Sequence, residues 1–266
     1  MNRMYFRSPF LVFNLLLIAL GGCYTNPETG RTSLNFISTG NELQLGISEF
    51  EKMKHETPIS SDPAMVGRLQ RVGQRIAEAV GNQLPSAQWE FVLFDDPNMI
   101  NAFALPGGKV GVYTGILDIA STDDELATVI GHEIAHVTAR HGSERMSQGI
   151  AAAIGGVILN EALKGDGDRN EWTAAYGAAS AYALAIPFSQ GHELEADHIG
   201  VIYAAKAGYN PEAAIEFWMK MNLVKEGKER SPFFSTHPSD YKRIDKLEAL
   251  MPKVKPIYEQ SKLRYR

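Results

Sequence analysis

Residues 122–141 read TDDELATVIGHEIAHVTARH, and this stretch decides how the rest of the chain must fold. Thr122, followed three residues later by Glu125, forms the pattern of a capping box, which begins a helix. Apolar residues then recur at helical spacing on more than one side of the helix. These apolar positions are Leu126, Val129, Ile130, Ile134 and Val137. We therefore predict a long, buried helix over 123–141.

Two histidines and a glutamate lie inside this predicted helix, as His132-Glu133-Ile134-Ala135-His136. Residues four apart on a helix are about 6 Å apart along the axis and about 40° apart around it, so His132 and His136 can converge on one metal ion. Glu133 lies about 100° round from His132, where a carboxylate can take a proton from an attacking water molecule. A chain of this length contains HExxH by chance on the order of one time in a hundred. The alternative is a set of ordinary buried polar residues, but burying these three side chains without a metal would be costly.

A second segment offers the donor that two histidines lack, because a catalytic zinc ion usually has three protein ligands. Residues 193–197 read ELEAD and lie on another predicted helix. Glu193 and Asp197 share one face of that helix, so one carboxylate can bind the ion while the other accepts the second N–H of a ligand histidine. Glu195 points away from that face. A solvated acidic patch is the alternative interpretation of this stretch.

The remaining sequence predicts a mostly helical domain with a small sheet early in the chain, which is an α+β fold. A strand over 88–94 and a hairpin of 101–105 with 109–113 are indicated by alternating apolar residues and by the turn at Pro106-Gly107-Gly108. Apolar residues at helical spacing, with capping and proline signals, predict the helices. They cover residues 41–56, 63–80, 144–163, 174–186, 190–207, 211–225 and about 239–250.

The start of the chain resembles a secretory leader. Residues 1–22 combine a cationic start, an apolar run too short to cross a bilayer and a small-residue end. The ending LGGC resembles a bacterial lipobox, in which Cys23 becomes acylated. We therefore expect a removable signal over 1–22, a lipidated tether over 23–36, a domain over 37–252 and a tail over 253–266. The alternative is an uncleaved anchor with a buried free thiol.

Composition limits the partners and the type of metal site. The 266 residues carry a formal net charge of -5 and no basic stripe, which argues against a nucleic-acid partner. Cys23 is the one cysteine, so a zinc site built from thiolates is excluded. Any metal must be held by histidine and carboxylate.

At these residues the chain resembles a known family. GHEIAH (131–136), ELEAD (193–197), NAFALPGG (101–108) and STHP (235–238) followed by Arg243 look like the HtpX/CaaX-protease family of zinc metallopeptidases, in the gluzincin group. The resemblance implies a zincin-type fold with one zinc ion per chain, held by His132, His136 and Glu193, with Asp197 behind a histidine ligand. The family often has Ser-Arg before the third-ligand helix, whereas this chain has Ser189-Gln190.

The resemblance also implies further residues at the site. Positions 237 and 243 face the metal in the family. We expect His237 to hydrogen-bond the tetrahedral intermediate or to bind zinc in a resting form, with Arg243 supporting it. A surface histidine in a turn is the alternative. Residues Ala102, Phe103, Ala104 and Leu105 are our candidate edge strand for an extended peptide, with an ordinary core hairpin as the alternative.

The other histidines and one small-residue helix receive lesser roles. His141 is five residues after His136, too far round a continuous helix to bind the same ion, and we interpret it as polarity at the helix end. His192 and His198 are expected near the site or at the surface, and His55 at the surface. Residues 149–163 suit a lid or a packing helix better than membrane insertion.

Together these features predict a zinc-dependent endopeptidase in which Glu133 is the general base. The resemblance implies a bacterial cell-envelope location, as a periplasm-facing lipoprotein of the outer membrane like the lipidated members of the family. It also implies misfolded or misassembled envelope proteins as substrates, with quality-control or assembly partners. The alternative function is an envelope assembly factor or chaperone with a latent protease site.

Overall fold

The computed structural model describes residues 22–164, 188–227, 232–238 and 241–265. The chain divides into two compact units, one formed by residues 40–141 and 186–266 and the other by residues 1–39 and 142–185. Residues 1–21 of the expected leader and the helix expected over 174–186 lie outside the described residues.

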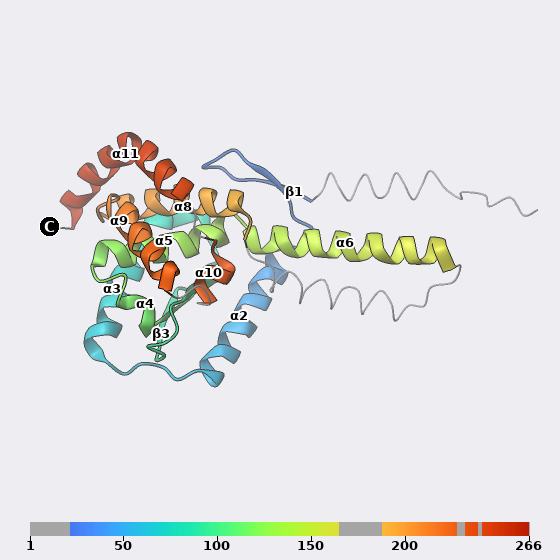
Figure 1. Ribbon diagram of the computed structural model, residues 1–266, viewed down its shortest axis with the longest axis horizontal. Helices are drawn as coiled ribbons and strands as arrows, with labels where there is room; N and C mark the ends of the chain where they lie inside the picture. The colour runs from blue at the N-terminus through green and yellow to red at the C-terminus, as the bar shows by residue number, and fades with distance from the viewer. Residues whose placement is uncertain (1–21, 165–187, 228–231, 239–240, 266) are drawn as a thin grey trace, which may run out of the picture. The chain divides into compact units, whose positions relative to one another are not determined.

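Helix α5 (Asp123–Thr138) is the central element of the larger unit (Figure 1). It begins with the predicted capping box: the Thr122 side chain accepts from the Glu125 backbone N–H, and the Glu125 carboxylate accepts from the Thr122 backbone N–H. Helix α8 (Gln190–Lys206) packs on α5 so closely that a Cβ added to Gly200 would lie 2.7 Å from the His132 backbone nitrogen. Glycine at the crossing therefore lets the acidic segment of α8 reach the histidines of α5.

A three-stranded sheet lies against α5. Strands β3 (Glu90–Phe94), β4 (Ala102–Leu105) and β5 (Lys109–Tyr113) are arranged in the order β3–β5–β4. The predicted hairpin is confirmed: β4 and β5 pair antiparallel, and Gly107 and Gly108 take φ angles of 94° and 79° in the turn. Strand β5 is parallel to β3, so the central strand is the last in sequence. This order leaves β4 at the edge, packed on α5.

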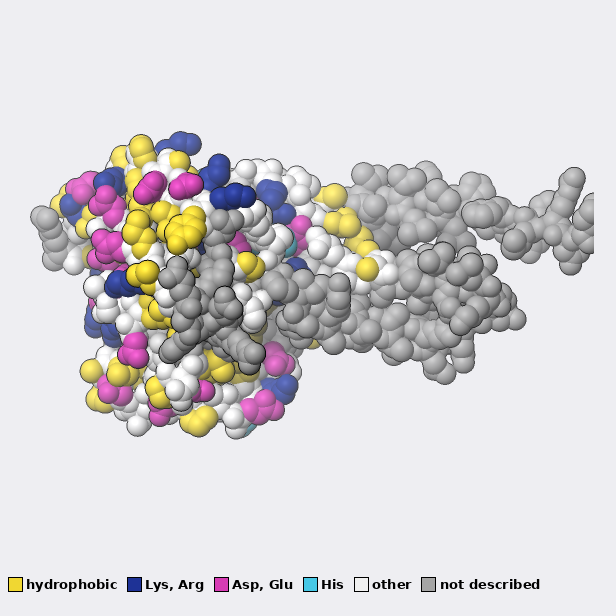
Figure 2. Space-filling view, viewed as in Figure 1, with side chains coloured by type: hydrophobic (Ala, Val, Ile, Leu, Met, Phe, Trp, Pro, Cys, Tyr) yellow, Lys and Arg dark blue, Asp and Glu magenta, His cyan; other side chains and the backbone are white. Residues whose placement is uncertain are grey.

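Helices cover the remaining faces of the core. They are α2 (Thr39–Glu56), α3 (Pro63–Val80), α9 (Ala213–Gly227) and α11 (Tyr241–Ser261), with short helices α4 (Thr114–Leu117), α10 (Pro232–Thr236), η1 (Gly81–Gln83) and η2 (Lys262–Arg264). Residues from α3, the sheet, α5, α8, α9 and α11 form one apolar cluster. The predicted α+β class is confirmed. On the face drawn in Figure 2, acidic and basic side chains lie interspersed and histidine is almost out of view.

Two helix ends differ from the prediction. Helix α5 ends at Thr138 and α6 (His141–Lys164) begins at His141, because Arg140 takes a left-handed φ of 57°. Helix α11 continues through Pro252 and Pro256 to Ser261, whereas we expected it to end near Leu250. Buried side chains after the first proline hold that segment against the core, which outweighs the backbone hydrogen bond that proline removes. The expected tail from residue 253 is therefore largely helical.

The smaller unit contains a hairpin and the rest of α6. Strands β1 (Cys23–Thr25) and β2 (Thr32–Leu34) pair antiparallel, so the stretch that we expected to be a tether is an ordered hairpin. The Asn26 side chain accepts from the Glu28 backbone N–H across 2.8 Å and supports the turn. Cys23 is exposed, and its acylation stays a prediction. None of the helices in the described ranges combines the length and the apolarity needed to cross a bilayer.

Candidate active site

The three residues of the HExxH motif lie deep in the larger unit. His132, Glu133 and His136 are 2%, 3% and 4% exposed. The Nε2 atoms of the two histidines lie 3.1 Å apart, one helical turn from each other on α5. Burying polar side chains is costly unless they form hydrogen bonds, ion pairs or metal contacts, so these three side chains need such partners inside the protein.

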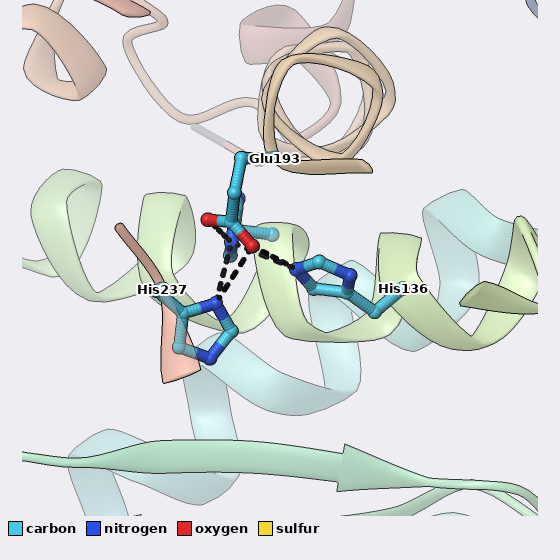
Figure 3. A group of neighbouring side chains, drawn as sticks. His136, Glu193 and His237 are labelled. Atoms are coloured by element: carbon cyan, nitrogen blue, oxygen red, sulfur yellow. Dashed lines mark hydrogen bonds and ion pairs between the residues drawn. The ribbon is translucent and has the colours of Figure 1, made fainter. Parts of the chain in front are cut away.

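Glu193 and His237 complete a group of four donors. Glu193 lies in the first turn of α8, whose N-terminus is capped by Ser189, and points down from α8 toward the rings below it (Figure 3). Its Oε2 is 3.4 Å from His132 Nε2 and its Oε1 is 3.3 Å from His136 Nε2. His237 follows α10 and places its Nδ1 3.2 Å from Glu193 Oε1. All four donor atoms lie within 4.8 Å of one another.

The spacing of these donors fits a tetrahedral zinc ion. Ligand atoms bonded to zinc at 2.0–2.1 Å in a tetrahedron are separated from one another by about 3.3 Å. The two histidines of α5 lie 3.1 Å apart, Glu193 reaches His132 with Oε2 and His136 and His237 with Oε1 at 3.2–3.4 Å, and His237 Nδ1 lies 3.4 Å from His132 Nε2. With one donor atom taken from each residue, no separation exceeds 4.8 Å. The donor set of three imidazoles and one carboxylate is also one that zinc accepts. The residues therefore fit the metal that the sequence predicts.

Glu133 lies beside this group and not in it. Its Oε1 is buried without a hydrogen-bond partner among the described residues, and His237 Nε2 lies 3.5 Å from it. Burial raises the pKa of the Glu133 carboxyl. A buried carboxyl oxygen without a hydrogen bond, next to the donor group, is placed to exchange a proton with a small molecule such as water.

An ionic network surrounds His132. Asp197 Oδ1 lies 2.9 Å from His132 Nδ1. Arg243 donates from Nε to Asp197 Oδ2 across 2.6 Å and from a terminal nitrogen to Glu193 Oε2 across 2.7 Å, and it stacks on Trp218. We expected Arg243 to support His237, whereas the structure places it on the two carboxylates. The sequence interpretation did not identify Trp218, because a tryptophan on a helix is usually a core residue.

A different network surrounds His136. His141 Nδ1 lies 2.8 Å from His136 Nδ1, and His141 Nε2 lies 3.0 Å from Glu195 Oε2. The interpretation of His141 as helix-end polarity is wrong, because the break at Arg140 turns the ring back toward His136. Glu195 is 7% exposed and does not face solvent. Sequence reasoning missed the role of His141, since it placed that residue on the same helix as His136, and it turned Glu195 away from Glu193 without identifying its partner.

The other histidines lie further from the donor group. His192 is buried, and its ring stacks on His141 with centroids 4.4 Å apart. His198 is half-buried and His55 is exposed. Gln190, which replaces the arginine of the family pattern, is exposed at the start of α8.

Electrostatics differ between the donors. For His132, burial alone lowers the pKa, but hydrogen bonds to Asp197 and Glu193 outweigh it and raise the pKa to about 9. For His136, burial dominates and holds the pKa well below its usual range. For Glu193, Arg243 and His237 outweigh burial and hold the pKa well below its ordinary value. His136 is therefore neutral and Glu193 ionised at neutral pH, the forms in which both can bind a metal ion.

The candidate substrate strand has the required free edge. Within the described residues, β4 pairs only with β5, so its other side has no strand partner. Ala102 is buried, and Phe103, Ala104 and Leu105 are half-buried. A lid role for 149–163 stays a prediction, since this stretch lies on α6 and most of its side chains lie outside the described set.

The chain is similar to known metallopeptidases. Residues 63–251 match the sequence profile of Peptidase family M48. Over 92% of the chain, it is 30% identical to mitochondrial metalloendopeptidase OMA1 of Saccharomyces cerevisiae, covering 76% of that protein, and 32% identical to its counterpart in Schizosaccharomyces pombe, covering 73%. It is 27% identical over 89% of the chain to the beta-barrel assembly-enhancing protease of Escherichia coli, of which it spans 49%.

Two sequence-based expectations change. The outer-membrane, periplasm-facing location is contradicted, because relatives that match over 92% of the chain are mitochondrial metalloendopeptidases. A cationic start followed by a short apolar run is a general feature of targeting segments, so it was weak evidence for one compartment. The comparisons also do not single out the HtpX-type or lipidated members within the family.

The family profile spans most of the chain and includes α5, the acidic segment of α8, His237 and Arg243. The donor group and Glu133 thus lie within the segment that matches the family profile. The chain belongs to peptidase family M48 and is a metalloendopeptidase.

Proposed function

We propose that the protein is a zinc-dependent endopeptidase that hydrolyses peptide bonds of misfolded or misassembled proteins. The observation that carries this proposal is the convergence of four buried donor atoms within 4.8 Å, beside the carboxyl group of Glu133. His132, His136 and Glu193 hold the ion in this proposal. When bound, zinc polarises the scissile carbonyl and lowers the pKa of a water molecule.

Glu133 is the general base. Its free oxygen accepts a proton from the attacking water and delivers it to the leaving amine. A positioned general base contributes about 10²–10⁴-fold to a rate. The raised pKa of the buried carboxyl suits it to hold the proton between these two transfers.

The geometry around His237 supports both of the roles expected of it. Its Nδ1 lies among the donor atoms, which supports the resting form in which it is the fourth ligand. Its Nε2 faces Glu133, so a small rotation lets the ring hydrogen-bond a developing oxyanion when a substrate displaces it. Arg243 supports the site through Glu193 and Asp197.

The peptide binds along β4 by strand addition. An edge strand offers a row of unpaired backbone groups that fix an extended peptide, while alternate side chains reach pockets. Strand β4 lies against α5, which carries Glu133 and both histidines, so a peptide on its free edge runs past the donor group. Proline substitution at Ala104 should therefore lower peptide turnover with the fold intact.

A second candidate function is a protein assembly factor in which the protease site is latent. The observation that favours it is the similarity to a bacterial relative, the beta-barrel assembly-enhancing protease of Escherichia coli. The buried general base weighs against a purely binding role, because a scaffold has no use for Glu133.

One variant separates the two functions. Glu133→Gln should retain zinc and partners but cleave casein about 10²–10⁴-fold more slowly. Glu51→Gln, at a half-exposed position on α2, is the control and should cleave at the normal rate. The purified protein should contain one zinc ion per chain, and a chelator should abolish cleavage. If Glu133→Gln fully rescues a deletion strain, assembly and not cleavage is the function.

A further inference from the structure

A chain of three buried side chains runs outward from the donor group on the His136 side. His136 Nδ1 lies 2.8 Å from His141 Nδ1, and His141 Nε2 lies 3.0 Å from Glu195 Oε2. The three residues are 4%, 0% and 7% exposed. We propose that His141 and Glu195 are positioning residues that fix the tautomer and the ring orientation of His136. This inference rests on the proposed role of His136 as a zinc ligand.

The hydrogen-bond chemistry allows one arrangement of protons. To bind zinc through Nε2, a neutral His136 must carry its proton on Nδ1. That proton needs an acceptor, and the atom 2.8 Å away is His141 Nδ1. His141 Nδ1 accepts only if the proton of that ring is on Nε2, where it is donated to Glu195. The Glu195 carboxylate accepts and cannot donate, so it sets the direction of both hydrogen bonds.

The fold fixes the two rings as well as their protons. Phe188 stacks on His136 with ring centroids 3.9 Å apart, and His192 stacks on His141 at 4.4 Å. Each imidazole therefore has an aromatic neighbour on one face and a hydrogen bond in its plane. Rotation of either ring would break both contacts.

The turn between α5 and α6 makes this chain possible. On a continuous helix, a residue five positions after His136 lies about 140° round the axis and faces elsewhere. Arg140, with a φ of 57°, ends α5 and redirects the backbone, and its guanidinium group is held by Glu42 at 3.0 Å. The left-handed residue therefore places His141 beside the ligand.

Zinc affinity tests the proposal without reference to activity. In competition with a chromophoric chelator, His141→Phe should bind zinc about 10–100-fold more weakly, the range typical for partners behind a histidine ligand. His141→Asn keeps an acceptor oxygen near the Nδ1 position and should recover most of that loss. His55→Phe, at an exposed position, is the control and should leave affinity unchanged.

A double variant separates tautomer control from packing. Glu195→Gln can donate to His141 and reverse its tautomer, so we expect about tenfold weaker zinc binding. Combined with His141→Asn, which has no tautomer, the same change should have almost no effect. A packing role predicts equal losses in both backgrounds. Long-range ¹H–¹⁵N correlation of the zinc-loaded protein should show His141 with its proton on Nε2.

The outcomes distinguish the possible failures. If the normal protein binds no zinc, the proposed function fails with the inference. If it binds zinc but the Glu195→Gln losses are equal in both backgrounds, or His141 carries its proton on Nδ1, the inference alone is wrong. Should His141→Phe not fold, the Glu195→Gln pair and the proton assignment decide the question by themselves.

Discussion

The two histidines of the HExxH motif are held from behind by surroundings of opposite character. His132 has an ionic flank, in which Asp197 accepts its hydrogen bond and Arg243 neutralises that carboxylate from above Trp218. His136 has an aromatic flank of His141, Phe188 and His192, with Glu195 at its far end. The same geometric task is thus done once by a cluster of ion pairs and once by stacked rings.

The two flanks differ in which interactions are lost when one partner is removed. Arg243 is 1% exposed and contacts two buried carboxylates, so its removal breaks two buried ion pairs at once. On the aromatic flank, the loss of one partner leaves a single unsatisfied hydrogen bond. We therefore expect the ionic flank to dominate stability and the aromatic flank to dominate the orientation of the ligand.

The largest predicted effect comes from the ionic flank. Arg243→Met should lower the free energy of unfolding of the metal-free protein by about 3–5 kcal/mol, because it breaks the buried ion pairs of Arg243 with Asp197 and Glu193. Urea unfolding followed by circular dichroism measures the change.

The matched variant on the aromatic flank is Glu195→Gln. It removes one hydrogen-bond acceptor and should cost about 1–3 kcal/mol. If it destabilises the metal-free protein as much as Arg243→Met does, the contrast between the flanks is wrong.

The next effect concerns the close contact between α8 and α5 at Gly200. A Cβ at Gly200 would lie 2.7 Å from the His132 backbone nitrogen and 2.9 Å from its Cα. Gly200→Ala should push α8 away from α5, destabilise the protein by about 1–3 kcal/mol and weaken zinc binding, since both flanks depend on this crossing. Thermal unfolding and chelator competition measure the two losses.

Gly67→Ala is the control for this substitution. Gly67 lies on α3, and a Cβ there would meet nothing within 4 Å. The exchange should stabilise the protein slightly, because alanine is the better helix former. Zinc affinity retained in Gly200→Ala would show that the α5–α8 contact does not set the donor positions.

The contrast also shows what the sequence could predict. The capping box at Thr122, the buried helix after it and the shared face of Glu193 and Asp197 follow from local spacing, and the structure brings those side chains together. The approach of His237 and Arg243 rested on resemblance, since contacts across more than a hundred residues leave no local pattern.

The aromatic flank was the part that local patterns could not reveal. No glycine or proline marks the end of α5, because the residue that takes the left-handed conformation is an arginine. A continuous helix was the natural interpretation, and it turned His141 away from the site. The parallel pairing of β3 with β5 was hidden for a similar reason, since the hairpin partner β4 lies between them in sequence.

A third prediction uses the different pKa values of the two histidines. Without metal, the pKa of His132 is about 9, whereas burial holds that of His136 well below its usual range. Zinc binding at pH 7 should therefore release about one proton, from His132, and affinity should rise about tenfold per pH unit until pH 9. Calorimetry in buffers of different ionisation enthalpy counts the protons.

The variants of each flank sharpen this prediction. Asp197→Asn removes the carboxylate that raises the pKa of His132, so fewer protons should be released at pH 7. Glu195→Gln lies on the other flank and should leave the count near one. A count that falls equally in both variants would mean that the flanks are not electrostatically distinct.

The smallest predicted effect tests how the aromatic flank is built. Arg140→Gly and Arg140→Ala both lose the ion pair with Glu42, but only glycine adopts a φ of 57° without steric cost. Alanine in that conformation costs about 1–2 kcal/mol more, so Arg140→Ala should melt a few degrees below Arg140→Gly. If alanine is as stable as glycine, the α5–α6 turn relaxes without the left-handed residue. The ring of His141 would then have to be held beside His136 by its own contacts with Glu195 and His192.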